Sequence, residues 1–517
     1  MAWFRAAFCA ALFFWASALA AQDVTLTSPD GQVEISGTLL GFDGEFYRVQ
    51  TIYGELTVDG SGVACDGPAC PNLQDFVAEI SVSGSATMGA VLMPALLEGF
   101  ALRSDYTASR ETIEGTSFTY VLSDETSGKP VARFYFHVST TDEGFADLLA
   151  NDADIVMALR EIRPGERQRA REAGMGDLTQ ANRSRVLALD ALVPIVATSN
   201  PVATIDPTAL ADVFAGRVTN WKDLGGADAP IALHLPGVRT GLGQAVEDDV
   251  MGPVGLQLAD TITRHDRGNT LVEAVLRDPF ALGIASFADA GQARALSLTG
   301  PCGFSLSADR GTIKTEDYPL TAPMFLYLPA RRLPKVAREF LAFTRSISAQ
   351  VVIRRAGFVD QAPEEVSIDE QGYRFANAVT SAGPEVPLEE LQRMTRTLYD
   401  MARLSTSFRF EAGSVRLDAQ SRSNVEQLAR ALEQGKYDAR RMLLVGFSDG
   451  DGPAEANRNI ALRRAEAVRR ALVAAAETAN FDRIQLEVDA FGEALPMACD
   501  DSAWGRQANR RVEVWVR

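Results

Sequence analysis

Two carboxylates followed by a basic run stand near the C-terminal end of the chain, in the stretch GFSDGDGPAEANRNIALRRA over residues 446–465. Asp449 and Asp451 have the two-residue spacing of the first oxygen ligands in a calcium loop. Such a loop would need a further oxygen ligand at position 453 and a bidentate carboxylate at position 460, where this chain has Pro453 and Ile460. The spacing therefore excludes a calcium loop.

The same stretch, together with a later one, resembles the OmpA-like peptidoglycan-binding family. That family has a Gly-His-Thr-Asp turn, then Asn-x-x-Leu-Ser-x-x-Arg-Ala at a helix start, and then a late Asn-Arg-Arg-Val-Glu strand. The corresponding residues occur here in the same order, as Gly446-Phe447-Ser448-Asp449, Asn457-x-x-Ile460-Ala461-x-x-Arg464-Ala465 and Asn509-Arg510-Arg511-Val512-Glu513. The hydrophobic periodicity of this segment also predicts a compact β-α-β-α-β-β domain.

The resemblance implies that this domain binds diaminopimelate, which carries an ammonium and a carboxylate group at its free end. An acid and an arginine at a fixed distance can bind both groups at once. Carried over by position, Asp449 binds the ammonium and Arg464 the carboxylate, with Ser448 and Asn457 in support. The chain departs from the family at Phe447, Ser448 and Ala461, and Ala461 removes a hydroxyl. The alternative is structural: Asp449 favours a helix N-terminus, and Arg464 is a solvated helix residue.

The central region opens with a strand, a Gly/Ser loop and an apolar helix in EISVSGSATMGAVLMPALL, residues 79–97. Such a loop can direct backbone N–H groups at an anion, although most loops of this kind are structural. Further segments, including ADIVMALREIRPGE and FAGRVTNWKDLGG, resemble the phosphate-type periplasmic substrate-binding proteins of ABC transporters. The resemblance implies two α/β lobes that close on an oxyanion, with binding residues at Ser85, Thr87, Met88, Thr140, Thr141, Asp154, Arg239, Thr240 and Gly241. In it, Asp154 accepts a proton from the protonated phosphate.

Two hydroxyls of that family pattern are replaced by leucines in this chain. Leu242 stands where the family has a threonine after Arg-Ser-Gly, and Leu159 stands where members often have a serine. Each unpaired oxygen of a buried phosphate costs about 1–3 kcal/mol, so these losses weaken binding or change the ligand. Phosphate or a related oxyanion, another small anion, and a cleft that serves only as scaffold all stay open.

The cysteines indicate disulfides rather than a metal site. Cys9 belongs to the predicted signal peptide, and four cysteines follow it. Cys65 and Cys70 flank a Gly-Pro turn and are expected to pair, whereas the pairing of Cys302 and Cys499 stays open. Zinc is disfavoured because the chain has only three histidines. No nucleophile stands beside a base and no Gly-x-Ser-x-Gly motif occurs, so we expect neither an enzyme nor a cofactor.

Charge and the first residues predict the compartment. The formal net charge is −18, with the excess acid in residues 1–402 and a nearly neutral segment after them, which argues against a nucleic-acid-binding footprint. Arg5, an apolar run over 6–19 and the Ala18-Leu19-Ala20 pattern predict a cleaved signal peptide over 1–20, with a retained membrane anchor as the alternative. No cysteine follows directly, so a lipoprotein is not expected. We therefore expect a periplasmic protein on the cell-wall or outer-membrane side of a Gram-negative envelope.

The predicted fold is multi-domain and mainly α/β. Residues 21–74 alternate apolar and polar residues between Gly turns, which predicts a small β-barrel-like module or sheet. Residues 77–358 predict a two-lobed α/β domain with a mostly parallel sheet. Residues 359–400 are Pro- and Glu-rich and predict a linker that enters a helix, and residues 403–517 form the OmpA-like domain. A flexible 35-residue linker would span roughly 30–35 Å.

These observations favour a non-catalytic periplasmic binding protein. It would capture phosphate or a related oxyanion while held non-covalently to peptidoglycan, for sensing, storage or localised capture rather than bulk transport. An ABC transporter permease or another envelope protein is the expected protein partner. The alternative is an envelope-organising protein whose binding domain is a scaffold or a protein-interaction module.

Overall fold

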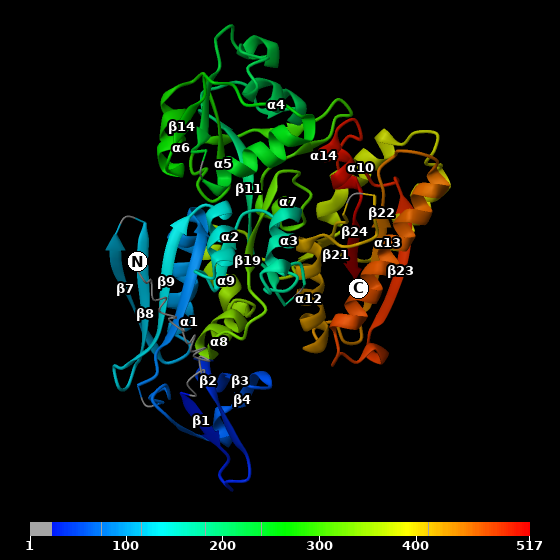
Figure 1. The fold of residues 1–517 in the computed structure, drawn as a ribbon. Coiled ribbons are helices and arrows are strands. Elements are labelled where there is room, and N and C mark those ends of the chain that lie inside the picture. The colour runs from blue at the N-terminus through cyan, green and yellow to red at the C-terminus, as the bar shows by residue number, and fades with distance from the viewer. Residues whose placement is uncertain (1–22, 74, 115, 181, 239, 412) are drawn as a thin grey trace, which may run out of the picture. The chain divides into compact units, whose positions relative to one another are not determined.

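The computed structural model describes residues 23–517 except 74, 115, 181, 239 and 412 (Figure 1). The predicted signal peptide with Cys9, and Arg239 of the predicted anion site, lie outside the described residues. The chain divides into two compact units, one with residues up to Ala78 and Arg332–Val336, and one with Glu79–Arg331 and Ala337–Arg517. Within the described residues, no helix combines the length and the apolar character that a membrane span requires.

The first unit is a five-stranded antiparallel sheet. Its small core is formed by Val24, Leu26, Tyr47 and Val49, as the alternating pattern predicts. A Cβ at Gly37 would lie 2.3 Å from the carbonyl oxygen of Gln50, so this position requires glycine. The described sheet is open at both edges, and its strand order is β4-β3-β2-β1-β5. The strands are β1 (Val24–Thr27), β2 (Glu34–Phe42), β3 (Phe46–Thr51), β4 (Gly54–Asp59) and β5 (Ala64–Asp66). The predicted Cys65–Cys70 disulfide closes the segment after β5.

The binding-domain part of the second unit is built on one large mixed sheet. Its order is β14-β13-β15-β11-β19-β10-β6-β9-β8-β7, and β16 (Arg294–Ala295) pairs with β11. The strands are β6 (Ala78–Ser85), β7 (Tyr106–Glu114), β8 (Ser117–Asp124), β9 (Pro130–Ser139), β10 (Ile155–Ala158), β11 (Ser184–Val196), β13 (Ala232–Pro236), β14 (Thr263–His265), β15 (Ala281–Ser286) and β19 (Thr321–Tyr327). β12 (Thr204–Ile205), β17 (Ser297–Thr299) and β18 (Ser305–Leu306) form a separate small sheet.

The sheet is not mostly parallel, and this corrects the sequence prediction. Among the pairings described for this sheet, those of β6 with β10, and of β13 with β14 and β15, are parallel, whereas β7, β8 and β9 form antiparallel hairpins. β11 and β19 also run antiparallel to each other. β11 pairs with β19 over residues 184–191 and with β15 over residues 192–196, so one long strand runs from the first lobe into the second.

The helices lie between and around these strands (Figure 1). They are α1 (Met93–Ala101), α2 (Thr141–Ala150), α3 (Pro164–Glu172), α4 (Pro207–Phe214), α5 (Gly241–Ala245), α6 (Gly268–Arg277), α7 (Arg310–Lys314), α8 (Lys335–Phe343) and α9 (Ile347–Arg355). Two π-helical turns, Met88–Leu92 and Val246–Met251, precede α1 and follow α5.

The C-terminal domain confirms the predicted β-α-β-α-β-β order and adds one short helix before the last strand. Its sheet has the order β20-β21-β24-β22-β23. The strands are β20 (Glu365–Val366), β21 (Ala402–Phe408), β22 (Arg441–Phe447), β23 (Gln485–Gly492) and β24 (Val512–Val516). The helices are α12 (Ala419–Glu433), α13 (Ala454–Ala475) and α14 (Ala503–Asn509).

The predicted linker covers one face of this sheet, and it is not a free spacer. Residues 360–398 contain β20, α10 (Gly372–Ser381) and α11 (Leu388–Leu398). Leu444 and Val514 pack with α12 and α13, whereas Leu443, Val445 and Trp515 pack with α10 and α11. Successive residues of a strand point to opposite faces, so β22 is apolar from Met442 to Phe447 because both of its faces are buried there.

Covalent and ionic contacts join the C-terminal domain to the binding domain within the second unit. Cys302 and Cys499 form a disulfide, which settles the pairing that the sequence leaves open. The buried Asp317 carboxylate accepts two hydrogen bonds from Arg403 and a third from Arg409. Asp317 is only 3% exposed and Arg403 is also 3% exposed, so this ion pair is shielded from solvent.

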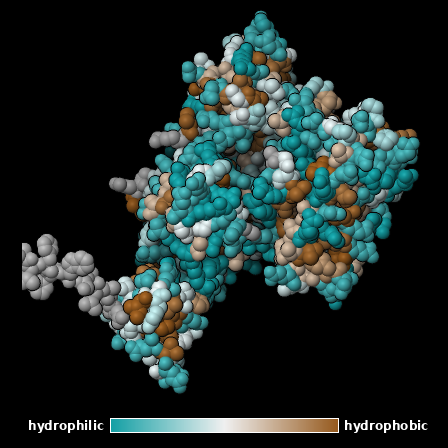
Figure 2. Space-filling model, turned by 45° about the vertical axis from the view of Figure 1, so that its right-hand side comes forward, coloured by the Kyte–Doolittle hydropathy of each residue, from teal (hydrophilic) through white to brown (hydrophobic). Residues whose placement is uncertain are grey.

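The surface of the second unit in Figure 2 is mostly hydrophilic, with patches of hydrophobic side chains. Tyr373, Val379, Leu388 and Tyr399 of the segment that carries α10 and α11 are among the large exposed apolar residues. The segment therefore has one apolar face on the sheet and further apolar residues at the surface.

Candidate functional site

The predicted peptidoglycan site lies where β22 ends and α13 begins. A Cβ at Gly446 would lie 2.1 Å from the carbonyl oxygen of Ala461, so only glycine lets the strand approach the helix this closely. Phe447 is fully buried and ends the strand, and Ser448 and Asp449 follow it at the edge of the sheet. The motif thus places Asp449 beside the first turns of α13.

Asp449, Arg464 and Arg510 form an electrostatic group at this edge. The Asp449 carboxylate lies 3.3 Å from the Arg510 guanidinium. Burial raises the pKa of Asp449, and the charges of Arg510 and Arg464 act in the opposite direction. Burial and the Arg510 charge lower the pKa of Arg464. The structure therefore places the predicted acid and base within each other's field, and it adds a second arginine.

Two buried polar atoms of this group have no partner in the described part of the chain. They are the hydroxyl oxygen of Ser448, a residue 2% exposed, and Nε of Arg464, a residue 5% exposed. The Arg464 guanidinium lies 5.3 Å from the ring centre of Phe410. Buried donors are normally hydrogen-bonded, so these atoms indicate a site that an external acceptor completes.

Asn457 supports the site from α13. Its side-chain amide donates to the Gly452 carbonyl and, at 2.9 Å, to the Glu493 carboxylate. Asp500 accepts a hydrogen bond from the Gly450 amide at 2.8 Å, next to Asp449. Asp449, Glu493 and Asp500 thus form an acidic group at the site, and Asp449 within it pairs with Arg510. The sequence prediction missed Glu493 and Arg510, although Arg510 lies inside the quoted Asn-Arg-Arg motif.

The other residues of that late motif have structural contacts. Asn509 is fully buried, and its side chain bonds the amides of Met497 and Ala498 and the Asp500 carboxylate. Arg511 lies 2.7 Å from the Glu513 carboxylate and 4.4 Å from the ring centre of Phe447. Asn509 therefore fixes the loop that carries Asp500, and Arg511 packs against Phe447, two residues before Asp449.

The predicted anion site is partly assembled at the carboxyl ends of β6 and β10. Ser85 ends β6, and the hydroxyl of Thr141 at the start of α2 accepts a hydrogen bond from the Leu159 amide just after β10. A Cβ at Gly241 would lie 2.8 Å from Leu159 Cδ1, so the start of α5 packs against the same residue. The structure thus brings Ser85, Thr141 and Gly241 to one edge, with a leucine among them.

Other predicted hydroxyls at this edge already have local partners. The Thr140 hydroxyl caps α2 by accepting from the Glu143 amide. The Thr240 hydroxyl accepts from the Gly243 amide and donates to the Gly237 carbonyl. Thr87 and Met88 lie at the π-helical turn before α1, and the Met88 amide lies 3.5 Å from the Ser85 hydroxyl. The donors of Ser85 and Thr141 are therefore better suited to an external anion.

Arg160, which the sequence prediction did not include, lies next to this edge. Its guanidinium bonds the Glu166 carboxylate at 2.8 Å and 2.9 Å and also contacts Asp142. Gln244 of α5 donates to Asp142 at 3.0 Å, which links the second lobe to the first. Among described atoms, Arg160 Nε, Gln244 Oε1 and the Ser139 hydroxyl are buried without a partner. These orphaned atoms indicate an incompletely satisfied polar site.

Asp154 does not join this group. It precedes β10, at the opposite end of the strand from Leu159, because the register pairs Ile155 with Val82 and Met157 with Gly84. Its carboxylate accepts from the Ser81 amide at 2.8 Å and pairs with Arg331 at 2.6 Å. Asp154 therefore lies too far from this edge to accept a proton from a phosphate bound there, and its predicted role is wrong.

Comparisons with known proteins agree with the architecture. Residues 78–346, just over half of the chain, match the family described as PBP superfamily domain. The chain belongs to the PBP superfamily. Residues 409–510 match the OmpA family, so the PBP-superfamily chain carries a C-terminal OmpA domain.

Related sequences and solved structures are similar to parts of the chain. Protein SphX of Synechococcus elongatus is 26% identical over 234 residues, which cover 43% of this chain and 67% of that protein. The phosphate-binding protein PstS of Bacillus subtilis is 27% identical over 192 residues, which cover 35% of this chain and 60% of PstS. An ABC-type phosphate transport receptor from Vibrio cholerae is 21% identical with a TM-score of 0.41, and covers 54% of this chain and 99% of the receptor.

Proposed function

We propose that the OmpA domain holds the chain to peptidoglycan by binding the diaminopimelate end of a stem peptide. The observation that carries this proposal is the buried Nε of Arg464, which has no partner among the described residues and lies in the field of Asp449. Arg464 and Arg510 supply donors for a carboxylate, and Asp449, Glu493 and Asp500 supply acceptors for an ammonium group. One zwitterion therefore satisfies both sides of the site.

A soluble muropeptide with a free diaminopimelate end tests this proposal by calorimetry. Replacing Arg464 by glutamine or Asp449 by asparagine is expected to weaken binding at least about tenfold, because each removes a charged partner worth about 1.5–3 kcal/mol. Arg470→Gln is the matched control, since Arg470 lies on the same helix and is 67% exposed. Equal affinity for wild type and both site variants would refute the assigned pair.

We infer that the binding domain captures phosphate or a related small oxyanion at the edge formed by Ser85, Thr141 and Arg160. Support comes from relatives whose names identify them as phosphate-binding, and from two buried donors at this edge without a partner among the described residues, Arg160 Nε and the Ser139 hydroxyl. The Thr141 hydroxyl accepts from the chain and keeps its hydrogen to donate. The protein is then a non-catalytic periplasmic receptor beside the wall, where a permease or another envelope protein would meet it.

A substitution of Asp142 tests this proposal, because the Asp142 carboxylate forms an ion pair with Arg160 and therefore competes with an anion for that guanidinium. Asp142→Asn is expected to raise phosphate affinity about tenfold in calorimetry, since a neutral amide competes less well for Arg160 and repels the anion less. Asp212→Asn is the control, because Asp212 on α4 pairs with the exposed Arg217 that follows this helix. Unchanged or weaker phosphate binding in Asp142→Asn would contradict the placement of the anion.

A second function, an envelope-organising role with the binding domain as scaffold, is favoured by one observation. Leu159 fills the space against Gly241, and Leu242 is also buried, so apolar groups occupy positions of the family's hydroxyls. The same calorimetry separates the two functions. Absence of heat with phosphate, sulfate and citrate, in wild type and Asp142→Asn alike, would leave the scaffold role.

A further inference from the structure

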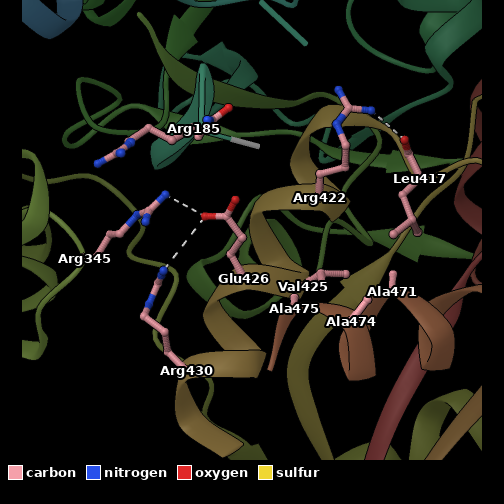
Figure 3. A pocket seen from close by; sticks show the side chains of 11 residues that line it. Arg185, Arg345, Leu417, Arg422, Val425, Glu426, Arg430, Ala471, Ala474 and Ala475 are labelled. Atoms are coloured by element: carbon pink, nitrogen blue, oxygen red, sulfur yellow. Dashed lines mark hydrogen bonds and ion pairs between the residues drawn. The ribbon is translucent and has the colours of Figure 1, made fainter. Parts of the chain in front are cut away.

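A cavity of about 560 Å³ lies between the binding domain and the OmpA domain, and none of the predicted site residues described above lines it (Figure 3). Arg185 of β11 and Arg345, which follows α8, line it from the binding domain. α12 contributes Arg422, Glu426 and Arg430. The end of α13 closes it with three small side chains, those of Ala471, Ala474 and Ala475.

The charges in this cavity are unbalanced. Four arginines line it with a single carboxylate, that of Glu426. Arg345 bonds this carboxylate at 2.6 Å, and Arg430 lies 3.9 Å from the same oxygen, so two guanidinium groups share one acid. Both point toward Glu426 in Figure 3. A positive charge therefore remains in the cavity after these pairs are counted.

Arg185 is the least compensated of the four. Its Nη1 donates to the Leu341 carbonyl at 2.8 Å, and its Nε is buried without a partner in the described part of the chain. Burial, followed by the charge of Arg345, lowers the pKa of Arg185 to about 9. An arginine that carries only a carbonyl partner in a shielded position is suited to accept an external anion.

The opposite wall of the cavity is apolar. Val425 and the three alanines of α13 present methyl groups, and Leu417 lies above them. The alanines leave space that longer side chains would fill. Figure 3 shows Arg185, Arg345 and Arg430 on one side of Glu426 and the alanines on the other. The cavity thus offers cations and an apolar surface to the same occupant.

We propose that this cavity binds a small amphipathic anion. Its phosphate or carboxylate group contacts Arg185, Arg345 and Arg430, and a short alkyl portion packs against the alanines of α13. Binding displaces Glu426 from part of its contact with the arginines. Because the walls come from both domains, the occupant also stabilises their contact within the second unit, by an amount that grows with the logarithm of its concentration above the dissociation constant.

Calorimetry of the full chain with butyl phosphate tests this site, with inorganic phosphate and hexanoate as separate arms. Glu426→Gln is expected to tighten butyl phosphate binding about tenfold, because it removes the carboxylate that Arg345 and Arg430 share. Arg185→Gln is expected to weaken binding about tenfold, because it removes a positively charged partner of the anion. Ala475→Leu fills the apolar end and should weaken butyl phosphate more than inorganic phosphate. Tighter binding of hexanoate than of butyl phosphate would assign a carboxylate ligand to the same site.

Two controls separate this site from the others. Arg470→Gln leaves the cavity lining intact and should bind butyl phosphate like wild type. In the Thr141→Val background, which weakens the proposed oxyanion edge, Glu426→Gln should still tighten butyl phosphate binding. The proposal is overturned if wild type, Glu426→Gln and Ala475→Leu bind butyl phosphate with equal affinity, or if none of them binds it. Glu426→Gln is a gain-of-binding variant, so misfolding cannot imitate its expected result.

Discussion

Replacing Cys302 and Cys499 together by serine is expected to lower the free energy of unfolding of the second unit by about 5 kcal/mol. The disulfide joins residues 197 positions apart, and closing so long a loop removes much of the conformational entropy of the unfolded chain. It links the binding domain to the OmpA domain, so its loss also weakens their contact. Denaturant unfolding followed by tryptophan fluorescence measures the effect, since Trp221, Trp504 and Trp515 all lie in this unit.

The matched control is the double replacement of Cys65 and Cys70. That disulfide closes a separation of only 5 residues in the first unit, for which the same relation gives about 2 kcal/mol. The tryptophan signal should not follow its loss, because the described tryptophans lie in the other unit. Equal tryptophan midpoints for wild type and the Cys302/Cys499 variant would show that the long-range disulfide does not stabilise the joined domains.

Arg403→Met is expected to destabilise the same unit by about 3–5 kcal/mol, because it leaves the buried Asp317 carboxylate with one arginine fewer. The substitution removes the two hydrogen bonds, of 2.7 Å and 3.1 Å, that Arg403 donates to Asp317, and methionine cannot replace them. Arg517→Met serves as control: Arg517 lies on the same domain, is 55% exposed and pairs with Asp400, an exposed pair worth less than about 1 kcal/mol.

The effect of Arg403→Met should depend on pH. The arginine charges outweigh burial and lower the pKa of Asp317 from 3.8 to about 2. A lowered carboxyl pKa contributes stability that is present above pH 3.8 and is lost as pH falls toward 2. The difference in unfolding free energy between wild type and Arg403→Met should therefore shrink between pH 5 and pH 2. A difference that is the same at pH 7 and pH 2.5 would contradict this account of the buried pair.

Sequence patterns identified the strands and the motif positions of the OmpA domain but not all of their partners. The apolar run of β22 predicts a buried strand, because each of its residues is hydrophobic or glycine apart from Arg441. The identity of the second covering layer could not be inferred, since α10 and α11 lie in a Pro- and Glu-rich segment that is typical of a linker. The apolar side chains of these two helices pack on Leu443, Val445 and Trp515, and this contact exists only in the tertiary structure.

Site residues show the same limit. Asp449 and Arg464 are predicted from the resemblance to the OmpA-like motif, whose residues lie in one turn and one helix and are therefore local features. Arg510 comes from the strand end 61 residues after Asp449, and only the tertiary structure brings the two together. The prediction for Asp154 failed for a related reason, because a motif position does not specify at which end of β10 the residue lies. In the structure Asp154 precedes β10 and pairs with Arg331.

Contacts between the domains change the expected mechanism of a wall-bound receptor. A flexible tether would let the binding domain sample a sphere around its anchor. Here the segment 360–398 is folded on the OmpA sheet, and Asp317 and the Cys302–Cys499 disulfide join the domains. We therefore expect an oxyanion captured by this chain to be held at a fixed place beside the wall. The rate at which the oxyanion dissociates, rather than diffusion of the binding domain, should then control its transfer.

Co-sedimentation of radiolabelled phosphate with insoluble peptidoglycan tests the central claim most directly, because it requires both sites in one chain. Wild type is expected to carry phosphate into the pellet. Arg464→Gln should leave both protein and phosphate in the supernatant, and Thr141→Val should pellet the protein without phosphate. Phosphate that stays in the supernatant while wild-type protein pellets would contradict the account of a wall-anchored oxyanion receptor.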